Sequence, residues 1–154
     1  MKAKSVVKVL ILVVVLAFVV LQFFQVDKTA PTIVQADTLE SVVTVPPDVS
    51  AILSRSCNDC HTNNTRYPWY SYMQPFGWFL KGHIDEGRQK LNLSTFRQSP
   101  PNRQAKKLAE MCSEVEKGDM PLPSYLWIHR DAVLKPGDAK ILCDWAKAES
   151  DKLD

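Results

Sequence analysis

Hydrophobic residues are concentrated in one uninterrupted run near the start of this chain. Every residue from Val9 to Leu21 is apolar, and three lysines precede the run. With the valines before it and the phenylalanines after it, the stretch approaches the ~20 residues that a helix needs to cross a bilayer. The pattern predicts a single N-terminal transmembrane helix within residues 1–26.

A cleavable secretory signal is the alternative for this segment. Its apolar core of about 7–15 residues would be followed by a cleavage site of small residues. After Phe24 the chain continues Gln-Val-Asp-Lys-Thr-Ala-Pro, which lacks a convincing site of that kind. We therefore expect an uncleaved anchor. Because lysines that flank a span tend to remain cytoplasmic, we expect the rest of the chain to be exported.

The hydrophobic pattern changes twice after the anchor. Residues 27–45 are rich in Thr, Val and Pro and show no helical stripe. This composition predicts an extended linker, in which Val42, Val43 and Val45 could pair as a short edge strand. Residues 46–150 are near the common size of one domain, so we expect a single folded unit there.

Apolar residues recur at helical spacing in four segments of this unit, which predicts helices. The segments are residues 47–57, about 74–91, 102–117 and 138 onward. The residues expected to face the core are Val49, Ile52 and Leu53 in the first, Ala105, Leu108, Cys112 and Val115 in the third, and Ile141, Leu142, Trp145 and Ala148 in the last. Gly118 is expected to end the third helix, since glycine is the usual residue just after a helix.

The pentapeptide Cys57-Asn58-Asp59-Cys60-His61 follows the first of these helices. Cys-x-x-Cys-His is the attachment signature of c-type haem. Two thiols three positions apart can each bond to a vinyl group of one porphyrin, and the next residue brings an imidazole to the iron. The motif predicts one covalent haem c, held by Cys57 and Cys60 with His61 as an axial ligand. Haem attachment suits an oxidising compartment, in agreement with an exported domain.

Zinc binding and thiol redox chemistry are the alternatives for the cysteine pair. A zinc site needs two further ligands at a comparable spacing, but Cys112 and Cys143 are far apart in the sequence. A thioredoxin-like pair would follow a buried strand in a βαβ pattern, and nothing before Cys57 has the pattern of such a strand. Both alternatives are therefore disfavoured.

Met120 is the leading candidate for the second axial ligand. Electron-transfer cytochromes commonly pair His with Met, which raises the reduction potential, and Met120 lies in a loop stiffened by prolines. His83 on the predicted second helix is the alternative, although an isolated histidine is more often a hydrogen-bonding residue. His129, Met111 and an open iron site remain as further candidates. Met120 could also serve only in loop packing.

Aromatic residues are dense after the motif and recur nearer the C-terminus. Such side chains usually fill a core or an interface. Next to a haem they would cover the porphyrin and exclude water. The residues expected to line the haem pocket are Tyr67, Trp69, Tyr70, Trp78 and Tyr125.

Cys112 and Cys143 are candidates for a disulfide between the third and last predicted helices. In an oxidising compartment such a closure would stabilise the fold by roughly 3–4 kcal/mol in the chain-entropy account. Two buried free thiols are the alternative. A catalytic thiol is not expected, because no paired base is recognisable near either residue.

Charge limits the classes of partner. The chain has 19 basic and 17 acidic residues, and the segment 1–27 holds three of the former and one of the latter. The exported part is therefore formally neutral. No basic patch argues for nucleic acid, and no acidic tail argues for a charged docking segment.

Four groups of residues follow one another in order along the chain. They are Cys57-Asn58-Asp59-Cys60-His61, Tyr67-Pro68-Trp69-Tyr70, the run from His83 through Gly87-Arg88 to Leu91-Asn92-Leu93-Ser94, and Met120-Pro121 with Tyr125 and His129. In this order they resemble the bacterial haem-binding-domain family of c-type cytochromes, over roughly residues 45–148. The resemblance implies a small monohaem domain, usually exported, found alone or beside peroxidase or cytochrome modules.

We therefore expect a mainly helical, cytochrome c-like domain wrapped around one covalent haem. The expected function is one-electron transfer on the periplasmic or extracytoplasmic side of a bacterial inner membrane, with a redox protein as partner. An electron carrier is favoured over an enzyme, and no organic substrate is expected. A haem-based small-molecule sensor and a peroxidase-associated haem module are the alternatives, and in the latter His83 and Arg88 could act at the iron.

Overall fold

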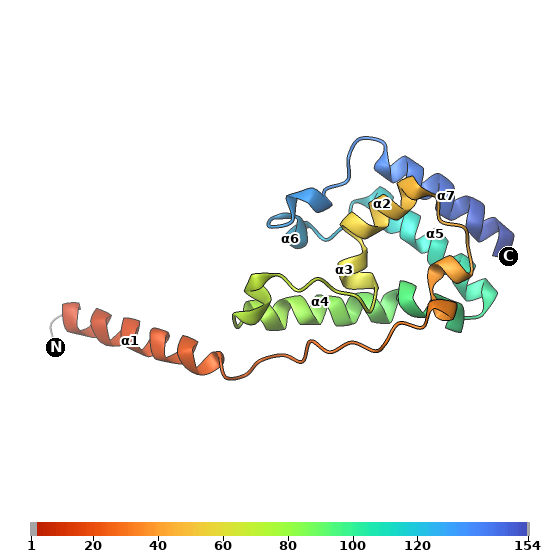
Figure 1. Cartoon of the computed structure of the whole chain (residues 1–154). Coiled ribbons are helices and arrows are strands. Elements are labelled where there is room, and N and C mark those ends of the chain that lie inside the picture. Colours follow the sequence, from red (N-terminus) through yellow and green to blue (C-terminus); the bar gives the residue numbers. More distant parts are fainter. Residues whose placement is uncertain (1–2, 154) are drawn as a thin grey trace.

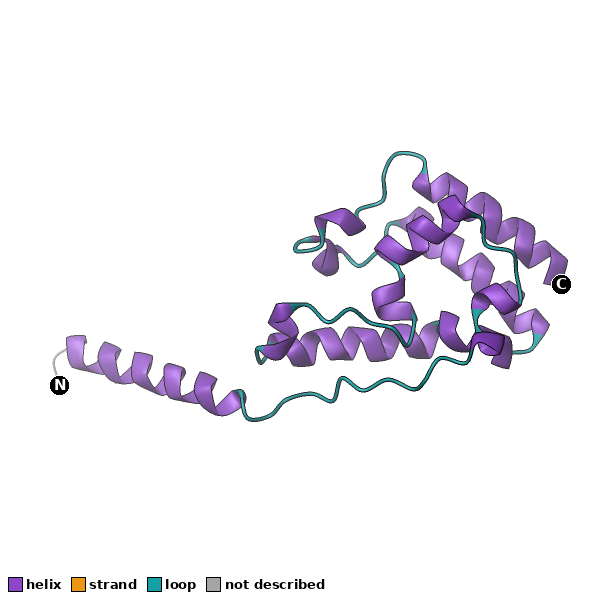
Figure 2. Ribbon diagram, viewed as in Figure 1, coloured by secondary structure: helices purple, strands orange, loops and turns teal. Residues whose placement is uncertain are grey.

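The computed structural model describes residues 3–153, which form helices, short 3-10 turns and loops without a strand (Figures 1 and 2). The helices are α1 (Ala3–Leu21), α2 (Pro47–Ser56), α3 (Asn58–His61), α4 (Phe76–Lys90), α5 (Pro101–Lys117), α6 (Pro123–Leu126) and α7 (Asp138–Leu153). The 3-10 turns are η1 (Gln35–Asp37), η2 (Leu39–Ser41), η3 (Trp69–Tyr72), η4 (Leu93–Gln98) and η5 (Arg130–Ala132). The expectation of a mainly helical fold is confirmed.

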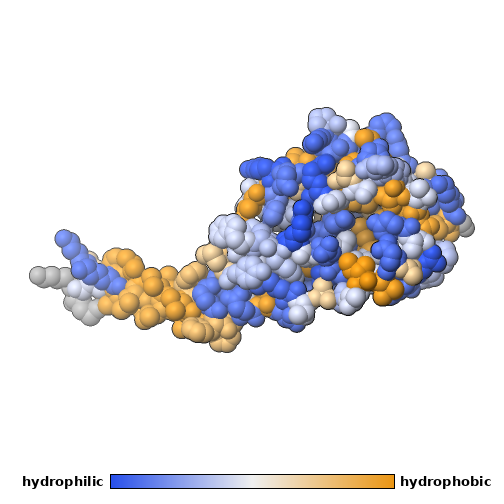
Figure 3. Space-filling view, viewed as in Figure 1, coloured by the Kyte–Doolittle hydropathy of each residue, from blue (hydrophilic) through white to orange (hydrophobic). Residues whose placement is uncertain are grey.

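Helix α1 projects from the folded domain as a separate rod (Figure 1). None of its described residues is buried, and its mean hydropathy of 2.7 makes it apolar enough to cross a membrane. An N-terminal signal sequence would meet the same criterion. Figure 3 shows the apolar surface of α1 as an orange extension of the molecule. The C-terminal end of this helix meets the domain.

The core of the domain lies between α2, α5 and α7, with η2 and η4 beside them. All the residues expected to form the stripes of the first and third predicted helices are buried. Helix α5 ends at Gly118, whose φ of +78° is the left-handed conformation that glycine adopts without a steric penalty. The helical spacing therefore predicted which faces of α2 and α5 are covered.

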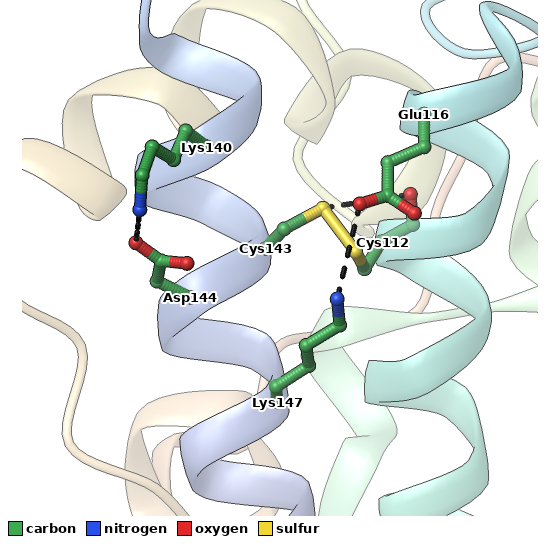
Figure 4. Close-up of a disulfide and its surroundings, with 6 residues drawn as sticks. All are labelled: Cys112, Glu116, Lys140, Cys143, Asp144 and Lys147. Carbon is green, nitrogen blue, oxygen red and sulfur yellow. Dashed lines mark hydrogen bonds and ion pairs between the residues drawn. A yellow bond between two sulfur atoms is a disulfide. The ribbon is translucent and has the colours of Figure 1, made fainter.

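A disulfide joins Cys112 on α5 to Cys143 on α7, with the Cα atoms 4.8 Å apart (Figure 4). Helices α5 and α7 pack along each other around this bond. The buried face of α7 consequently includes Cys143 and Ala146 rather than Ile141 and Ala148, which are exposed. Of the four residues expected on this face, Leu142 and Trp145 are buried as predicted. The other two were wrong, because contact with α5 sets which side of α7 is covered.

The linker before the domain is shorter than the expected residues 27–45. Leu39 is fully buried and Val43 is 5% exposed, and both belong to the hydrophobic core. The backbone here forms η1 and η2, which pack against η4, so the valines of this segment do not form the edge strand that was considered. The apolar side chains of this segment pack against the helices because burial removes them from water.

Candidate functional site

The Cys-x-x-Cys-His segment forms a single tight helical turn after α2. Cys57 ends α2, donating its N–H to the carbonyl of Leu53 at 2.9 Å, and its own carbonyl then accepts from the N–H groups of Cys60 and His61 at 3.2 and 3.0 Å. Both cysteines are partly buried and neither forms a disulfide. The turn thus holds two free thiols and an imidazole within five residues.

The imidazole of His61 is oriented by a backbone hydrogen bond. Its Nδ1 lies 2.9 Å from the carbonyl oxygen of Leu91. A carbonyl can only accept, so Nδ1 carries the proton and Nε2 keeps its lone pair. Burial lowers the pKa of His61, which favours the neutral ring. A histidine that binds a metal through Nε2 commonly has this tautomer, with Nδ1–H donating to a carbonyl in the same way.

A polar network holds the Leu91 segment against the turn. The Asn92 side chain donates to Asn63 Oδ1 at 2.9 Å, and Ser94 Oγ accepts from the Asn63 N–H at 3.0 Å. Arg88 on α4 donates to the Thr62 carbonyl at 2.9 Å. These bonds join the two residues that follow His61 to α4 and to the segment just after Leu91, whose carbonyl orients the ring.

Helix α4 approaches the turn closely at Gly87. A Cβ atom at this position would lie 3.0 Å from the Cys60 carbonyl oxygen and 3.3 Å from Cys60 Cβ. Only a residue without a side chain allows this contact without displacement. Gly87 therefore allows α4 to pack directly against Cys60.

Asp59, between the two cysteines, binds side chains from two other segments. Its carboxylate accepts from the Tyr125 hydroxyl at 2.9 Å and from Arg66 Nε at 3.1 Å. Burial and the negative charge of Asp59 raise the pKa of Tyr125, so its hydroxyl remains a donor. The loop that carries Met120 is thereby connected to the turn through Tyr125.

Two neighbouring cavities open onto the turn. The main cavity has a volume of about 660 Å³, within the range of cofactor pockets, and the side cavity about 170 Å³. Cys57, His61 and Met120 line both. Met111, Leu134 and Leu142 add apolar lining to the main cavity, and Cys60, His83 and Tyr125 line the side cavity. We call the two cavities together the hollow. The motif and both candidate second ligands therefore lie around it.

The polar groups of the main cavity are mostly paired. Lys107 and Lys117 form salt bridges with Glu110 and Glu114, at 2.6 and 2.9 Å. Lys90 also lines both cavities and forms no salt bridge among the residues that the structure describes. Its ammonium is therefore available to an anionic group of a ligand.

Ser56 adds an unpartnered polar atom to the same hollow. It lines both cavities, and its Oγ is buried without a hydrogen-bond partner. A buried hydroxyl of this kind costs free energy unless a further group satisfies it. A ligand with polar substituents would meet this need.

The two thiols are suited to remain protonated. Burial raises the pKa of Cys57 to about 12 and that of Cys60 to about 11. Within residues 3–153, Cys112, Glu116 and Cys143 are the one group of three His, Cys, Asp or Glu side chains whose ligand atoms converge, and two of these are used in the disulfide. The geometry thus argues against a zinc site at Cys57 and Cys60.

The aromatic residues expected to line the pocket are divided by the structure. Tyr125 lines the side cavity, whereas Tyr67, Trp69, Tyr70 and Trp78 lie outside both cavities. Trp69 is 73% exposed. The Trp78 indole donates instead to the Phe24 carbonyl at 2.9 Å.

The two histidines outside the motif have different surroundings. His83 packs edge to face on Phe79, with ring centroids 4.4 Å apart, and lines the side cavity. His129 Nε2 lies 2.7 Å from the Tyr70 hydroxyl, and its ring stacks on Tyr125. His129 is therefore occupied in a tyrosine cluster, and His83 remains near the turn.

Three contributors to the site have no side-chain signal in the sequence. The Leu91 carbonyl is a backbone group, Ser56 is one of many serines, and Lys90 resembles any surface lysine. The spacing of Gly87 from its neighbours suggests a close approach, but not to which residue. The packing of α4 against α3 brings Lys90 and Leu91 to the turn, whereas Ser56 lies beside it at the end of α2.

The residues present fit a haem. The hollow offers a neutral imidazole with a free Nε2, two protonated thiols beside it, a methionine that lines the same cavities and a free ammonium. The model of a family described as haem-binding domain matches residues 16–148 of the chain. Neither a curated protein nor a solved structure is found to match it.

Proposed function

Because this chain belongs to the haem-binding domain family, we propose that it is a membrane-anchored monohaem c-type cytochrome that transfers single electrons outside the bacterial inner membrane. The observation that carries the proposal is the His61 ring, whose Nδ1 donates to the Leu91 carbonyl beside two free thiols. When bound, the haem supplies the one-electron ferric and ferrous couple. The chain's residues hold it and shield it from water.

Cys57 and Cys60 would form the two thioether bonds, and His61 Nε2 would bind the iron. Thioether formation adds a thiol to a vinyl group, and the raised pKa values of both cysteines keep them as thiols at neutral pH. The hydrogen bond to Leu91 prevents rotation of the imidazole and raises its basicity as a ligand.

Met120 is the proposed second axial ligand, and His83 is the alternative. Met120 lines both cavities with His61, whereas His83 lines only the smaller one and is packed on Phe79. A His and Met pair gives a higher reduction potential than most other ligand sets. Lys90 would pair with a haem propionate, since it has no other anionic partner among the described residues.

Anchoring by α1 would keep the domain near membrane redox proteins. The helix has the length and composition for a single span, and the lysines before it favour a cytoplasmic N-terminus. The linker and domain would then lie on the periplasmic or extracytoplasmic side. A redox protein is the expected partner.

An enzymatic role receives less support. A peroxidase-associated module would need a polar group at the open side of the iron to assist O–O cleavage. Arg88 lines neither cavity and donates instead to the Thr62 carbonyl and the Thr65 hydroxyl. A haem-based sensor would need a second ligand that small molecules displace, and Met120 would be that ligand.

The proposal is tested on full-length protein matured in a host with the haem-attachment machinery. The intact mass should increase by one haem, and the increase should be lost in a Cys57→Ala, Cys60→Ala double variant. A reversible one-electron redox titration without carbon monoxide binding is expected for an electron carrier. Carbon monoxide binding to the ferrous protein would favour the sensor, and an unchanged mass would disprove covalent attachment.

A further inference from the structure

The end of α1 is hydrogen-bonded to the folded domain. Gln22 just after α1 and Gln74 just before α4 pair twice, since Gln74 N–H donates to Gln22 Oε1 at 2.9 Å and Gln22 Nε2 donates to the Gln74 carbonyl at 3.1 Å. The Gln25 side-chain Nε2 also donates to the Tyr72 carbonyl, at 3.3 Å. The domain is therefore held against the end of α1, although a linker of many residues separates them in sequence.

Two further contacts extend this junction. The Trp78 indole donates to the Phe24 carbonyl at 2.9 Å. The ammonium of Lys28 lies 4.1 Å from the centre of the Tyr72 ring, a cation–π distance. Both contacts come from the first residues after α1 and reach the segment from η3 to the start of α4.

This segment has an unusual composition. Residues 67–80 contain no charged residue. The whole chain has six Phe, four Trp and four Tyr residues, and seven of these aromatic residues lie in this segment. Several of these rings are exposed. We call them the aromatic patch: Trp69, Tyr72, Phe76, Trp78 and Phe79, with exposed fractions between 40% and 73%.

The geometry of α4 places the helical part of the patch on the side away from the core. Gly77, Leu80 and Ile84 form the buried face of α4. At 100° per residue, Trp78 and Phe79 lie on the opposite face. In Figure 1 the N-terminal end of α4, with η3 beside it, is the part of the domain nearest the C-terminal end of α1. The exposed rings are thus grouped where the chain leaves the apolar helix.

We propose that the aromatic patch lies in the headgroup and glycerol region of the bilayer that α1 spans, so that the domain rests on the membrane in one fixed orientation. This inference depends on the proposed anchoring by α1. Trp and Tyr are enriched at this depth because their apolar rings carry a polar group that remains hydrated. Phe23 and Phe24, exposed directly after α1, would continue the same belt.

Lipid is favoured over a protein partner by the position of the patch. The Tyr72 carbonyl and the Trp78 indole bind Gln25 and Phe24, which directly follow the proposed membrane-spanning helix. Lipid headgroups would therefore surround the patch without any further binding event. Lys28 beside Tyr72 adds a positive charge of the kind that marks lipid interfaces. An exposed apolar patch of this kind on an exported domain would otherwise favour aggregation.

The test uses photolabelling of the haem-loaded full chain in phosphatidylcholine vesicles. The vesicles contain a lipid with a diazirine near the glycerol group, and no other protein is present. After reduction of the Cys112–Cys143 disulfide, trypsin gives residues 67–81 with the whole patch, 9–28 with most of α1, and 141–147 from α7 on the far side of the domain. We expect label in 9–28 and in 67–81, the latter about tenfold above 141–147, because interfacial rings contact lipid and α7 does not.

The outcomes separate the two proposals. Label in 9–28 with only background label in 67–81 would overturn the inference and leave the anchor standing. Background label in both peptides would overturn the anchor as well. Label in all three peptides to the same extent would also refute a specific orientation.

A matched pair of variants provides the second test. Phe76→Glu places a charge in the patch at the start of α4, where a carboxylate is favourable for the helix. Ile141→Glu places the same charge on exposed α7. We expect labelling of 67–81 to fall several-fold in the first variant only, with α1 labelling and the haem spectrum unchanged in both. Equal labelling of 67–81 in the two variants would contradict the proposal.

Discussion

The Nδ1 atom of His61 lies 2.9 Å from the carbonyl oxygen of Leu91. These residues are 30 positions apart, and the contact fixes which nitrogen of the ring carries a proton. The polar bonds of Asn92 and Ser94 hold the carbonyl in place. The orientation of the His61 ring therefore depends on a backbone group outside the motif.

Met120→Ala should change the haem spectrum, whereas His83→Ala should not. Loss of the thioether leaves the iron without its sixth ligand, so the low-spin ferrous spectrum should disappear and the reduction potential should fall. Absorption spectra and a redox titration of matured protein measure both effects. Met111→Ala, which also removes a methionine from the main cavity, is the control and should keep the low-spin spectrum. Loss of that spectrum in His83→Ala alone would assign the ligand to His83.

Gly87→Ala should destabilise the domain and Gly82→Ala should not. A Cβ at Gly87 would meet the Cys60 carbonyl at 3.0 Å, and displacing such packed backbone costs about 1–3 kcal/mol. A Cβ at Gly82 meets nothing within 4 Å, and alanine there should stabilise α4 by about 0.5–1 kcal/mol. Denaturant unfolding of the two variants measures the difference. Equal free energies of unfolding would mean that α4 does not pack on the turn as described.

Alkylation of Cys57 and Cys60 in folded, haem-free protein should be slow and strongly pH-dependent. Their pKa values, raised by burial to about 12 and about 11, lie above the usual value of 9.0, so the reactive thiolate is rarer at every pH below them. At pH 8 the rate with iodoacetamide should be on the order of 100-fold below that of the urea-unfolded chain, and it should rise with pH. Circular dichroism confirms that the haem-free chain is folded. Equal rates in the folded and unfolded chains would show that the thiols are not desolvated.

Replacing Cys112 and Cys143 by serine should lower stability. The bond closes a separation of 31 residues, for which the chain-entropy account gives roughly 3–4 kcal/mol. Guanidinium unfolding of wild type and the double variant measures this difference. A reducing agent should lower the stability of wild type and leave the variant unchanged. No effect of the reductant on wild type would indicate that the two thiols are free.

Local patterns in the sequence predicted much of the fold. The apolar run gave α1, and residues at helical spacing gave the buried faces of α2 and α5, because these depend only on the period of the helix. The spacing of Cys57, Cys60 and His61 predicts a haem-attachment site in the same local way, and this site stays a prediction. Gly118 was expected at the end of α5, since its left-handed conformation is a local property.

The tertiary structure decided whatever depends on distant segments. The face of α7 follows from its contact with α5, and Leu39 enters the core because η2 packs on η4. The aromatic residues between 67 and 79 looked like haem-pocket lining, but they lie outside the cavities and partly bond to the chain after α1. A single sequence encodes periodicity and spacing, because these arise from neighbouring residues. It does not show which distant groups meet, because that depends on the packing of the whole chain.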